Sequence, residues 1–285
     1  MKIACVVNIS KPEAITYAGK IAILFFSQNA QVYMLSECEE HFKGFKISYV
    51  PDIEELFKIC DIAVTVGGDG TIIHAAKYAA KYTTPLIGVN VGRLGFAADV
   101  EVDEINKLTR LLKGDYSTEK RMLLDVEVVK PGGEKHYLAV NDAVVARGQL
   151  SKTIDLQLSL DGEEISKYRA DGLLFSTPTG STAYSLSAGG PIIAPNIECI
   201  LMTPVCPHSL FSRSALFDSN SKLEVTVKIP SDCCCVLTVD GEKNVDINSE
   251  DKIIIKKSEL SLTLISIHKR NFYRKINEKL KERDF

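Results

Sequence analysis

The sequence predicts a two-domain protein with an α/β N-terminal domain and a C-terminal domain made mainly of antiparallel β-strands. Up to about residue 100, strand-like apolar runs alternate with helix-like runs, whereas the later runs are short, strand-like and separated by turn residues. The length of 285 residues also exceeds the usual size of one domain. We expect domains at 1–100 and 101–267, with a C-terminal helix at 268–285 that joins the first domain.

The N-terminal part consists of repeated strand and helix patterns. Helices between its strands imply parallel pairing, because a crossover must carry the chain back across the sheet. A further helix at 102–113 should end at Gly114, since glycine adopts the left-handed conformation that closes helices. The expected strands are 2–8, 31–35, 61–66 and 85–90, and the expected helices between them are 12–29, 53–60 and 71–82.

The C-terminal part contains short apolar segments with turn residues between them. Pro131-Gly132-Gly133 and Asp161-Gly162 are such turns. Short strands joined in this way are typical of an antiparallel sandwich or layered β domain. The expected strands are 123–130, 137–147, 154–160, 172–177, 223–229, 236–239, 252–256 and 261–267.

Composition and charge exclude several classes of protein. A formal net charge of -3 gives no general attraction to nucleic acid or to an anionic membrane, so we expect neither as a partner. No apolar run approaches the ~18 residues of a membrane helix, and the N-terminus lacks secretory features, so we expect a cytoplasmic protein. Its eight cysteines should then be reduced thiols. The run Cys233-Cys234-Cys235 lacks the spacing of a metal site, and we assign no resident metal ion.

A first dense motif, Gly67-Gly68-Asp69-Gly70-Thr71, lies between an expected strand and an expected helix. Ligands bind at the carboxyl ends of parallel strands, and glycine amides beside a helix N-terminus suit a phosphate. We therefore take Gly67, Gly68 and Gly70 as phosphate-binding residues. An acid repels phosphate, which makes Asp69 a candidate catalytic base or magnesium contact. On spacing alone, a tight Asp-Gly turn with Thr71 as helix cap explains the motif equally.

A second dense segment runs from Tyr168 to Pro191. A strand leads into a turn that is rich in hydroxyls and glycine and contains one aromatic residue, Tyr184. Small donors beside an aromatic face suit a ribose, a phosphate and a base together. A Ser/Thr-rich turn with a helix start at Ser181 explains any four of these residues, but it explains the whole run poorly.

These motifs, with Asn90-Val91-Gly92-Arg93-Leu94-Gly95-Phe96 and Asn141-Asp142 between them, closely resemble the NAD kinase family over nearly the whole chain. The run from Thr177 to Pro191 is the most specific part, because GGDGT is also similar to loops of phosphofructokinases and diacylglycerol kinases. The resemblance implies transfer of the terminal phosphoryl group of ATP, another nucleoside triphosphate or polyphosphate to the adenosine ribose 2′-hydroxyl of NAD, with Mg²⁺. It also implies a homodimer or homotetramer.

The resemblance also implies roles for single residues. Asp69 matches the acid that activates the ribose 2′-hydroxyl, Gly70 a ligand-contacting backbone position, and His74 a basic residue near the dinucleotide. Asn141 matches the asparagine that contacts adenine. The other positions that match dinucleotide-binding residues are Asp142, Arg169, Asp171, Thr182, Ala183, Tyr184, Ser185, Leu186 and Ser187.

Two positions depart from the family pattern. Asp142 stands where glutamate is common, so the shorter carboxylate must reach further or recruit a water. Glu242, in Asp240-Gly241-Glu242, stands where a neutral amide is common, and we leave Glu242 out of the site. Two other functions stay open. A lipid or sugar kinase that shares GGDGT should lack the run at 182–187, and a non-catalytic NAD(P)-binding module would tolerate loss of Asp69.

Overall fold

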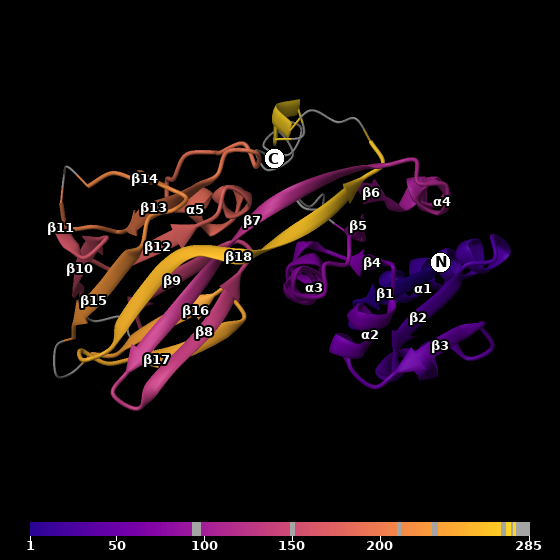
Figure 1. Cartoon of the computed structure of the whole chain (residues 1–285), viewed down its shortest axis with the longest axis horizontal. Coiled ribbons are helices and arrows are strands. Elements are labelled where there is room, and N and C mark those ends of the chain that lie inside the picture. Colours follow the sequence, from indigo (N-terminus) through magenta and orange to yellow (C-terminus); the bar gives the residue numbers. More distant parts are fainter. Residues whose placement is uncertain are drawn as a thin grey trace. The chain divides into compact units, whose positions relative to one another are not determined.

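The computed structural model describes residues 1–92, 98–148, 152–209, 212–229, 233–268, 272–274 and 276–277. The chain forms two compact units, of which unit 1 is Met1–Lys120 with Leu262–Phe285 and unit 2 is Arg121–Ser261 (Figure 1). It enters unit 2 within strand β7 (Ser117–Lys130) and returns to unit 1 within strand β18 (Lys252–Ser266). The predicted fold class is confirmed, since unit 1 is α/β and unit 2 is mainly antiparallel β.

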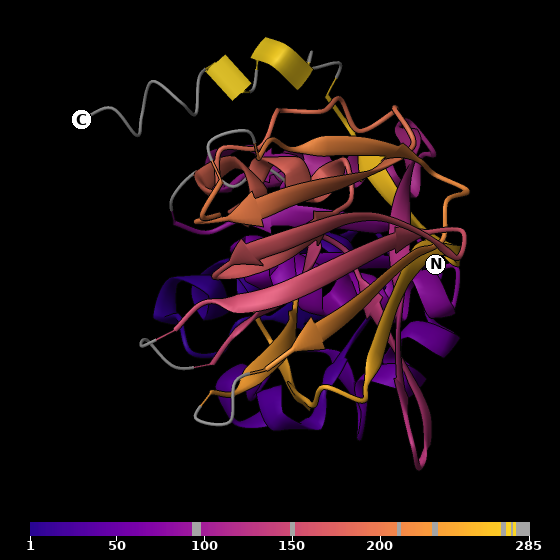
Figure 2. The ribbon, with the colours of Figure 1, turned by 90° about the vertical axis from the view of Figure 1, so that its left-hand side faces the viewer.

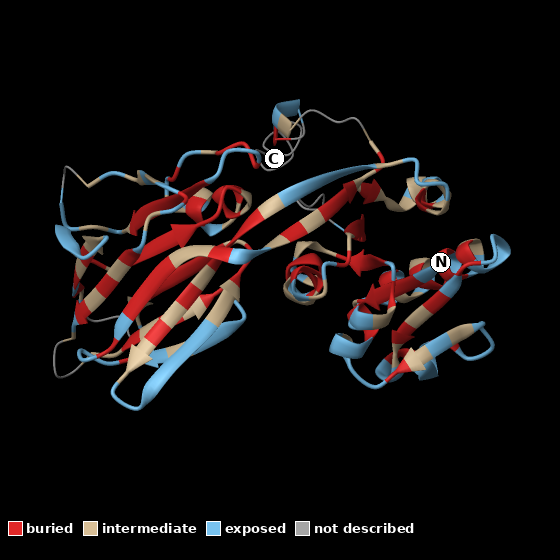
Figure 3. Ribbon diagram, viewed as in Figure 1, coloured by how far each residue is buried: buried red, intermediate tan, exposed pale blue. Residues whose placement is uncertain are grey.

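Unit 1 is built on a parallel sheet with the strand order β18-β5-β4-β1-β2-β3, in which only the end of β18 takes part. Strands β4 and β5 are buried at every position, as expected for central strands that are covered on both faces (Figure 3). The strands are β1 (Lys2–Val7), β2 (Gln31–Leu35), β3 (Ile47–Val50), β4 (Ile62–Gly67) and β5 (Leu86–Asn90). The connecting helices are α1 (Pro12–Ser27), the 3₁₀ helix η1 (Ser36–Phe42), α2 (Ile53–Ile59) and α3 (Asp69–Lys81).

The strand order reverses between β1 and β4. From β1 the chain moves outward to β2 and β3, and it then returns to the other side of β1 with β4 and β5. Val7 at the end of β1 pairs with Val66, and the Asn8 N–H donates to the Val66 carbonyl at 3.0 Å. Such a switch point, at the carboxyl ends of the strands, is where open α/β sheets bind ligands. The glycine-rich turn follows β4 at this point.

The division between the units falls after Lys120, whereas the sequence led us to expect it after residue 100. Strand β6 (Val100–Glu101) pairs with β5. The following helices, η2 (Val102–Leu108) and α4 (Thr109–Leu112), bury Leu108 and Leu111 in the core of unit 1. The predicted helix at 102–113 is thus two short helices, and Gly114 follows them with a φ of 67°.

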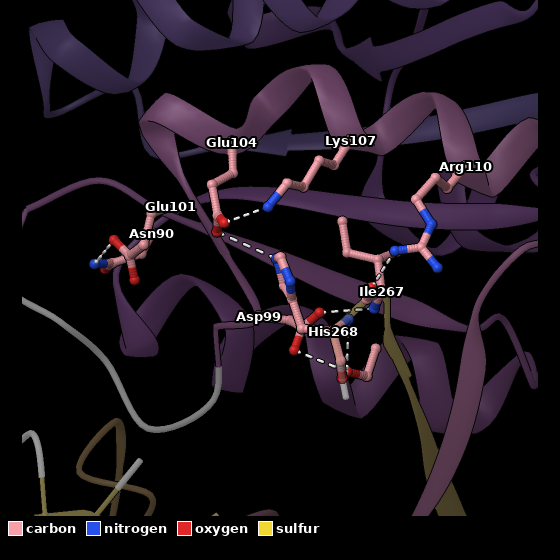
Figure 4. Close-up of polar contacts among 9 residues, drawn as sticks. Asn90, Asp99, Glu101, Glu104, Lys107, Arg110, Ile267 and His268 are labelled. Atoms are coloured by element: carbon pink, nitrogen blue, oxygen red, sulfur yellow. Dashed lines mark hydrogen bonds and ion pairs between the residues drawn. The ribbon is translucent and has the colours of Figure 1, made fainter. Parts of the chain in front are cut away.

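Polar contacts join the segment around Asp99 and Arg110 to the end of β18 (Figure 4). The Asp99 carboxylate accepts hydrogen bonds from the Ser266 hydroxyl at 2.9 Å and from the Ile267 N–H at 2.8 Å. The Arg110 guanidinium donates to the Ile267 carbonyl. These contacts attach the returning chain to unit 1. Of the expected C-terminal helix, residues 272–274 and 276–277 are helical, and 269–271, 275 and 278–285 lie outside the described residues.

Unit 2 consists of antiparallel strands that pack around one core (Figure 2). One sheet has the order β14-β13-β12-β9-β16-β17, and β11, β10, β15 and β18 are neighbours in a second. Strand β8 pairs with β7. Beyond β7 and β18, the strands are β8 (Gly133–Ala139), β9 (Asp142–Arg147), β10 (Ile154–Leu160), β11 (Glu163–Ala170), β12 (Gly172–Ser176), β13 (Cys199–Val205), β14 (Ala215–Asp218), β15 (Leu223–Lys228), β16 (Cys235–Val239) and β17 (Lys243–Ile247).

Several predicted strands of unit 2 differ from the observed ones. The continuous strand expected at 137–147 is wrong, because β8 ends at Ala139 and β9 begins at Asp142. At the break, the N–H groups of Val140 and Asn141 donate to the Asp240 carboxylate. The strands expected at 252–256 and 261–267 are one strand, β18, and the prediction missed β11, β13, β14 and β17. Strand β11 is an outer strand of its sheet whose side chains are mostly exposed, so it lacks an apolar pattern.

The eight cysteines are free thiols, as expected. Burial raises the pKa of the Cys235 thiol to about 12, so this thiol stays protonated at neutral pH. Among the residues that the structure describes, no helix combines the length and the apolar character needed to cross a membrane.

Two adjacent phenylalanines of α1 test the packing of unit 1. Phe25 is fully buried, whereas Phe26 is 45% exposed and carries the Lys46 ammonium 4.6 Å from its ring centroid. We expect Phe25→Ala to lower the free energy of unfolding by about 3–5 kcal/mol, because it opens a cavity. Phe26→Ala should cost about 1 kcal/mol or less. Urea unfolding followed by circular dichroism measures both, and equal losses would contradict the described packing of α1.

Candidate active site

The glycine turn of unit 1 is held tightly at the end of β4. A Cβ atom on Gly67 would overlap the Thr71 hydroxyl and lie 3.1 Å from the Asn8 Cβ. Gly67 is therefore required by packing, whatever it binds. A Cβ on Gly70 would meet nothing within 4 Å, so the backbone there is open to a ligand. Gly68 precedes α3 and gives that helix no side-chain cap.

Asp69 is the first residue of α3 and is half-buried. A carboxylate at a helix N-terminus is stabilised by the partial positive charge there. His74 is exposed, and its ring centroid lies 5.8 Å from that of Tyr78. Five residues of α-helix turn the chain by about 140° beyond one full turn, so Asp69 and His74 project in different directions. The structure therefore gives Asp69 and His74 different surroundings.

Lys11 brings a positive charge to the glycine turn, and the sequence analysis missed it. Its ammonium donates to the Val91 carbonyl at 3.2 Å. The same nitrogen lies 3.7 Å from the position that a Cβ on Gly68 would take, and 3.5 Å from that on Gly92. A cation at this position offsets the repulsion between Asp69 and an incoming phosphate. In the sequence the only signal was that Lys11 closely follows the first strand.

Asn90 ends β5 beside the same turn, since it pairs with Gly67. It is 1% exposed, and its amide donates to the Glu101 carboxylate at 2.9 Å (Figure 4). Its buried Oδ1 has no hydrogen-bond partner among the described residues. Such an oxygen and the Asp69 carboxylate are ligands of the type that Mg²⁺ prefers, so the donor set fits this cation. Residues 93–96 of the predicted motif lie outside the described residues.

In unit 2, the loop after β12 packs on the corner at Asn141. The buried Thr177 hydroxyl donates to the Val140 carbonyl at 2.7 Å, and the Thr177 N–H donates to the Asn141 carbonyl at 2.9 Å. The Gly180 N–H in turn donates to the Thr177 hydroxyl at 3.0 Å. A Cβ on Gly180 would fall on the Asn141 carbonyl, so glycine is required for this close approach. The structure thus brings the predicted dinucleotide loop and Asn141 together.

The predicted run 182–187 divides into buried and exposed side chains. It spans the end of the 3₁₀ helix η3 (Thr179–Thr182) and the short helix α5 (Tyr184–Ser187). Ser185 is fully buried, and its hydroxyl lies 3.0 Å from that of Thr203, so it has a partner within the unit. Thr182 is also buried. Tyr184 is 47% exposed, Ser187 is exposed, and Ala183 and Leu186 are half-buried.

Asp142 is buried beside a second carboxyl group. It is 5% exposed. Two causes raise its pKa to about 7, of which burial is the larger and the negative charge of Asp240 is the smaller. Near neutral pH this group therefore exists in both forms, and the protonated form can donate a hydrogen bond.

Arg169 and Asp171 lie near Arg147, at the other end of β9. Asp142 begins β9 and Arg147 ends it, and Arg147 pairs with Asp171 at 2.9 Å. Five residues of strand span about 17 Å, so Asp171 and Asn141 lie well apart within the unit. Arg169 is exposed and pairs with Asp155 at 2.9 Å, which lowers the pKa of Asp155. These residues line a pocket of about 490 Å³ with Lys152, Thr153 and His208.

One group of potential metal ligands occurs among the described residues. Carboxylate oxygens of Glu127 and Glu134 and a ring nitrogen of His136 lie within 4.8 Å of one another. His136 is already hydrogen-bonded to Asp125 at 3.0 Å, and the Lys256 ammonium lies 3.6 Å from Glu127. These neighbours compensate the acidic charge without an ion. That the chain holds no resident metal ion stays a prediction.

A switch-point glycine turn with an acid, in one chain with a β unit that carries a hydroxyl-rich loop, is the architecture of a nucleotide-dependent phosphotransferase. The model of the ATP-NAD kinase N-terminal domain matches residues 3–116, and that of the C-terminal domain matches residues 140–267. The chain belongs to the NAD kinase family. This confirms the predicted family and the predicted NAD kinase activity.

Individual relatives agree. An NAD kinase of Natranaerobius thermophilus is 35% identical over 276 residues, which cover 96% of this chain and 95% of the relative. A yeast NADH kinase crystallised with NADH has a TM-score of 0.90 at 26% identity, with coverage of 99% of this chain and 87% of that one. An Archaeoglobus fulgidus NAD kinase crystallised with ATP has a TM-score of 0.78 at 26% identity and 99% coverage of both chains.

Replacing Gly180 with alanine tests the contact between Gly180 and the Asn141 backbone, because alanine adds one methyl group there. Gly180→Ala should force the Asn141 corner to move, lower the free energy of unfolding by about 1–3 kcal/mol and weaken NAD binding. Gly132→Ala is the matched control, because a Cβ there meets nothing within 4 Å. Its effect on unfolding should stay within about 0.5 kcal/mol. Thermal unfolding and calorimetric titration with NAD measure these effects. Normal NAD affinity in Gly180→Ala would contradict the described packing of the loop.

Proposed function

We propose that Asp69 orients and deprotonates the adenosine ribose 2′-hydroxyl of NAD for attack on the terminal phosphoryl group of ATP. The observation that supports this most is the position of Asp69, at the first turn of α3 beside the glycine turn at the switch point. Phosphoryl transfer is catalysed mainly by alignment and charge neutralisation, so a well-placed acid and nearby positive groups suffice. The ATP and NADH complexes of the two structural relatives support ATP and a nicotinamide dinucleotide as ligands.

The phosphates would be held by the glycine turn. The N–H groups of residues 67–70 and the N-terminus of α3 present positive partial charge, and the Lys11 ammonium adds a full charge beside Gly68. Mg²⁺, bound with ATP, would supply the remaining charge neutralisation. Asp69 and the buried Asn90 oxygen are the residues of the chain suited to contact it.

The dinucleotide would be bound by unit 2. Asn141 would hydrogen-bond the adenine, and the exposed ring of Tyr184 would pack against the bound ligand. Ser187 is exposed and Ala183 and Leu186 half-buried, so they can also contact it, whereas buried Ser185 and Thr182 would act through the shape of the loop.

We further propose a cytoplasmic homodimer or homotetramer. Arg169 and Asp171 lie near Arg147, at the end of β9 that is about 17 Å from the Asn141 corner, so a second subunit is one way for them to reach a bound dinucleotide. Light scattering at assay concentration should give the mass of a dimer or tetramer, and a monomer mass would exclude this part of the proposal. Recovery of the protein in the membrane fraction of cells would contradict the location.

The activity is tested directly by incubating the purified chain with ATP, MgCl₂ and NAD and detecting NADP with an NADP-specific dehydrogenase. Chelation of Mg²⁺ by EDTA should abolish product formation, since the triphosphate charge is then uncompensated. Diacylglycerol and fructose 6-phosphate serve as alternative acceptors. Product from either of these, but none from NAD, would point to a lipid or sugar kinase.

Asp69→Asn separates the chemical role of the acid from its role in the turn. Asparagine keeps the size and turn preference but removes the basicity, so the melting temperature should hardly change. Turnover should fall by at least about 100-fold, as expected for loss of general-base catalysis, while calorimetric NAD affinity falls much less. Asp52→Asn, at the N-cap of α2, is a matched control in the same unit and should leave turnover unchanged. An Asp69→Asn variant with more than about a tenth of normal turnover would show that the acid only shapes the turn.

A further inference from the structure

The turn between β16 and β17 places a carboxylate against the backbone of the Asn141 corner. Asp240 Oδ1 accepts hydrogen bonds from the N–H groups of Val140 at 3.1 Å, Asn141 at 2.7 Å and Asp142 at 3.2 Å. Its Oδ2 also lies 3.0 Å from the Val140 nitrogen. The Asp240 N–H donates to the Asp142 carbonyl at 2.9 Å. Three successive N–H groups that converge on one anion form the kind of concavity known as a nest.

The opposite side of the same corner is held by Thr177. Its hydroxyl donates a hydrogen bond to the Val140 carbonyl, and its N–H donates one to the Asn141 carbonyl. The backbone at Asn141 therefore has its donor satisfied by Asp240 and its acceptor by Thr177. Because the backbone at Asn141 is already fixed, the Asn141 side chain can move only between its own rotamers. Binding a ligand then costs only side-chain conformational entropy.

We propose that Asp240 is a positioning residue that fixes Asn141 and Asp142 for contact with the dinucleotide. This rests on the proposed role of Asn141 in NAD binding. Asp240 adopts a φ of 51° in an Asp-Gly turn, a left-handed conformation that aspartate accepts more readily than most residues, so the turn can present this carboxylate. The sheet holds this turn in place beside the corner, because Val239, directly before Asp240, pairs with Ala143 of β9.

Asp240 also acts on Asp142 through its charge. Asp142 is surrounded by Ser176 of β12, with which it pairs, and by the Asp240 turn. Burial is the larger cause of its raised pKa, and the Asp240 charge is the second. The folded state therefore favours the protonated form of Asp142. This contribution to stability is complete below the ordinary pKa of an aspartate and is lost as pH rises through about 7.

Asp240→Asn tests the proposal. Asparagine also adopts left-handed φ values, so the turn can form, but its neutral oxygen is a weaker acceptor and its amide nitrogen faces N–H donors. The KM for NAD should rise about tenfold or more, because a charged hydrogen-bond acceptor is lost. The KM for ATP and kcat should change little, as expected when binding is weakened equally in the ground and transition states.

The pH profile provides a readout that a purely structural role would not change. In wild-type protein, the stability contributed by protonated Asp142 should be lost near pH 7. In Asp240→Asn the loss should occur at lower pH, since the neighbouring charge is gone. Asp240→Glu keeps the charge but displaces the carboxylate, so it should raise the KM for NAD without moving the pH profile. This second variant keeps the test available if Asp240→Asn does not fold.

Two further variants complete the design. Glu242→Gln removes one negative charge from the same exposed turn and should leave the KM for NAD and the pH profile as in wild type. In a variant that already carries Asn141→Ala and Asp142→Ala, adding Asp240→Asn should weaken NAD binding hardly further, because the contacts through which Asp240 acts are already removed. A full additional loss would show that Asp240 does not act through these two residues.

The outcomes distinguish this inference from the proposed function. If wild-type protein forms no NADP from ATP and NAD, the proposed function fails. If wild-type protein forms NADP but Asp240→Asn has a KM for NAD within about twofold of wild type and an unshifted pH profile, then the positioning role fails alone.

Discussion

Backbone N–H and C=O groups need partners where a strand ends, and this need shapes the candidate ligand-binding region of each unit. Within a sheet these groups bond to neighbouring strands, and at a strand end they must find other partners or water. At the end of β4 the Gly67 carbonyl accepts from Val91, and the chain turns directly into α3. At the break between β8 and β9, the N–H groups bond to Asp240 and the carbonyls to Thr177. The residues best placed to bind a ligand stand at these two breaks.

The same constraint explains the glycines that cannot be replaced. Gly67 is pressed against Thr71 and Asn8, and Gly180 against the Asn141 backbone. A Cβ at either position would push apart segments that the hydrogen bonds draw together. Gly70 and Gly132 occupy open space, so their neighbours would tolerate a methyl group. A glycine in a binding motif can thus serve packing or access, and the structure distinguishes the two.

Two acids of the candidate site have different electrostatic surroundings. Asp69 is half-buried at the first position of α3, and the Lys11 ammonium lies near Gly68 of the same turn. Asp142 is almost fully buried beside Asp240, and both burial and the like charge favour its neutral form. The proposed catalytic acid and the buried acid beside Asn141 thus lie in different environments.

The sequence by itself determined the class of fold and the position of both motifs. Alternating strands and helices in the first hundred residues required a parallel sheet, and the short strands between turns required an antiparallel unit. Local chemistry also placed the glycine turn correctly between β4 and α3.

Tertiary structure alone decided which distant groups meet. Lys11 reaches the glycine turn because β1 lies beside β4, and Asp240 breaks the expected strand at 137–147 from a turn about a hundred residues away. The tertiary structure also places Asp171 far from Asn141, because the length of β9 separates them, and the order of the motifs along the chain does not show this distance. Local sequence encodes the periodicity of an element, whereas these contacts depend on strand order and register, which are fixed only when the whole sheet packs.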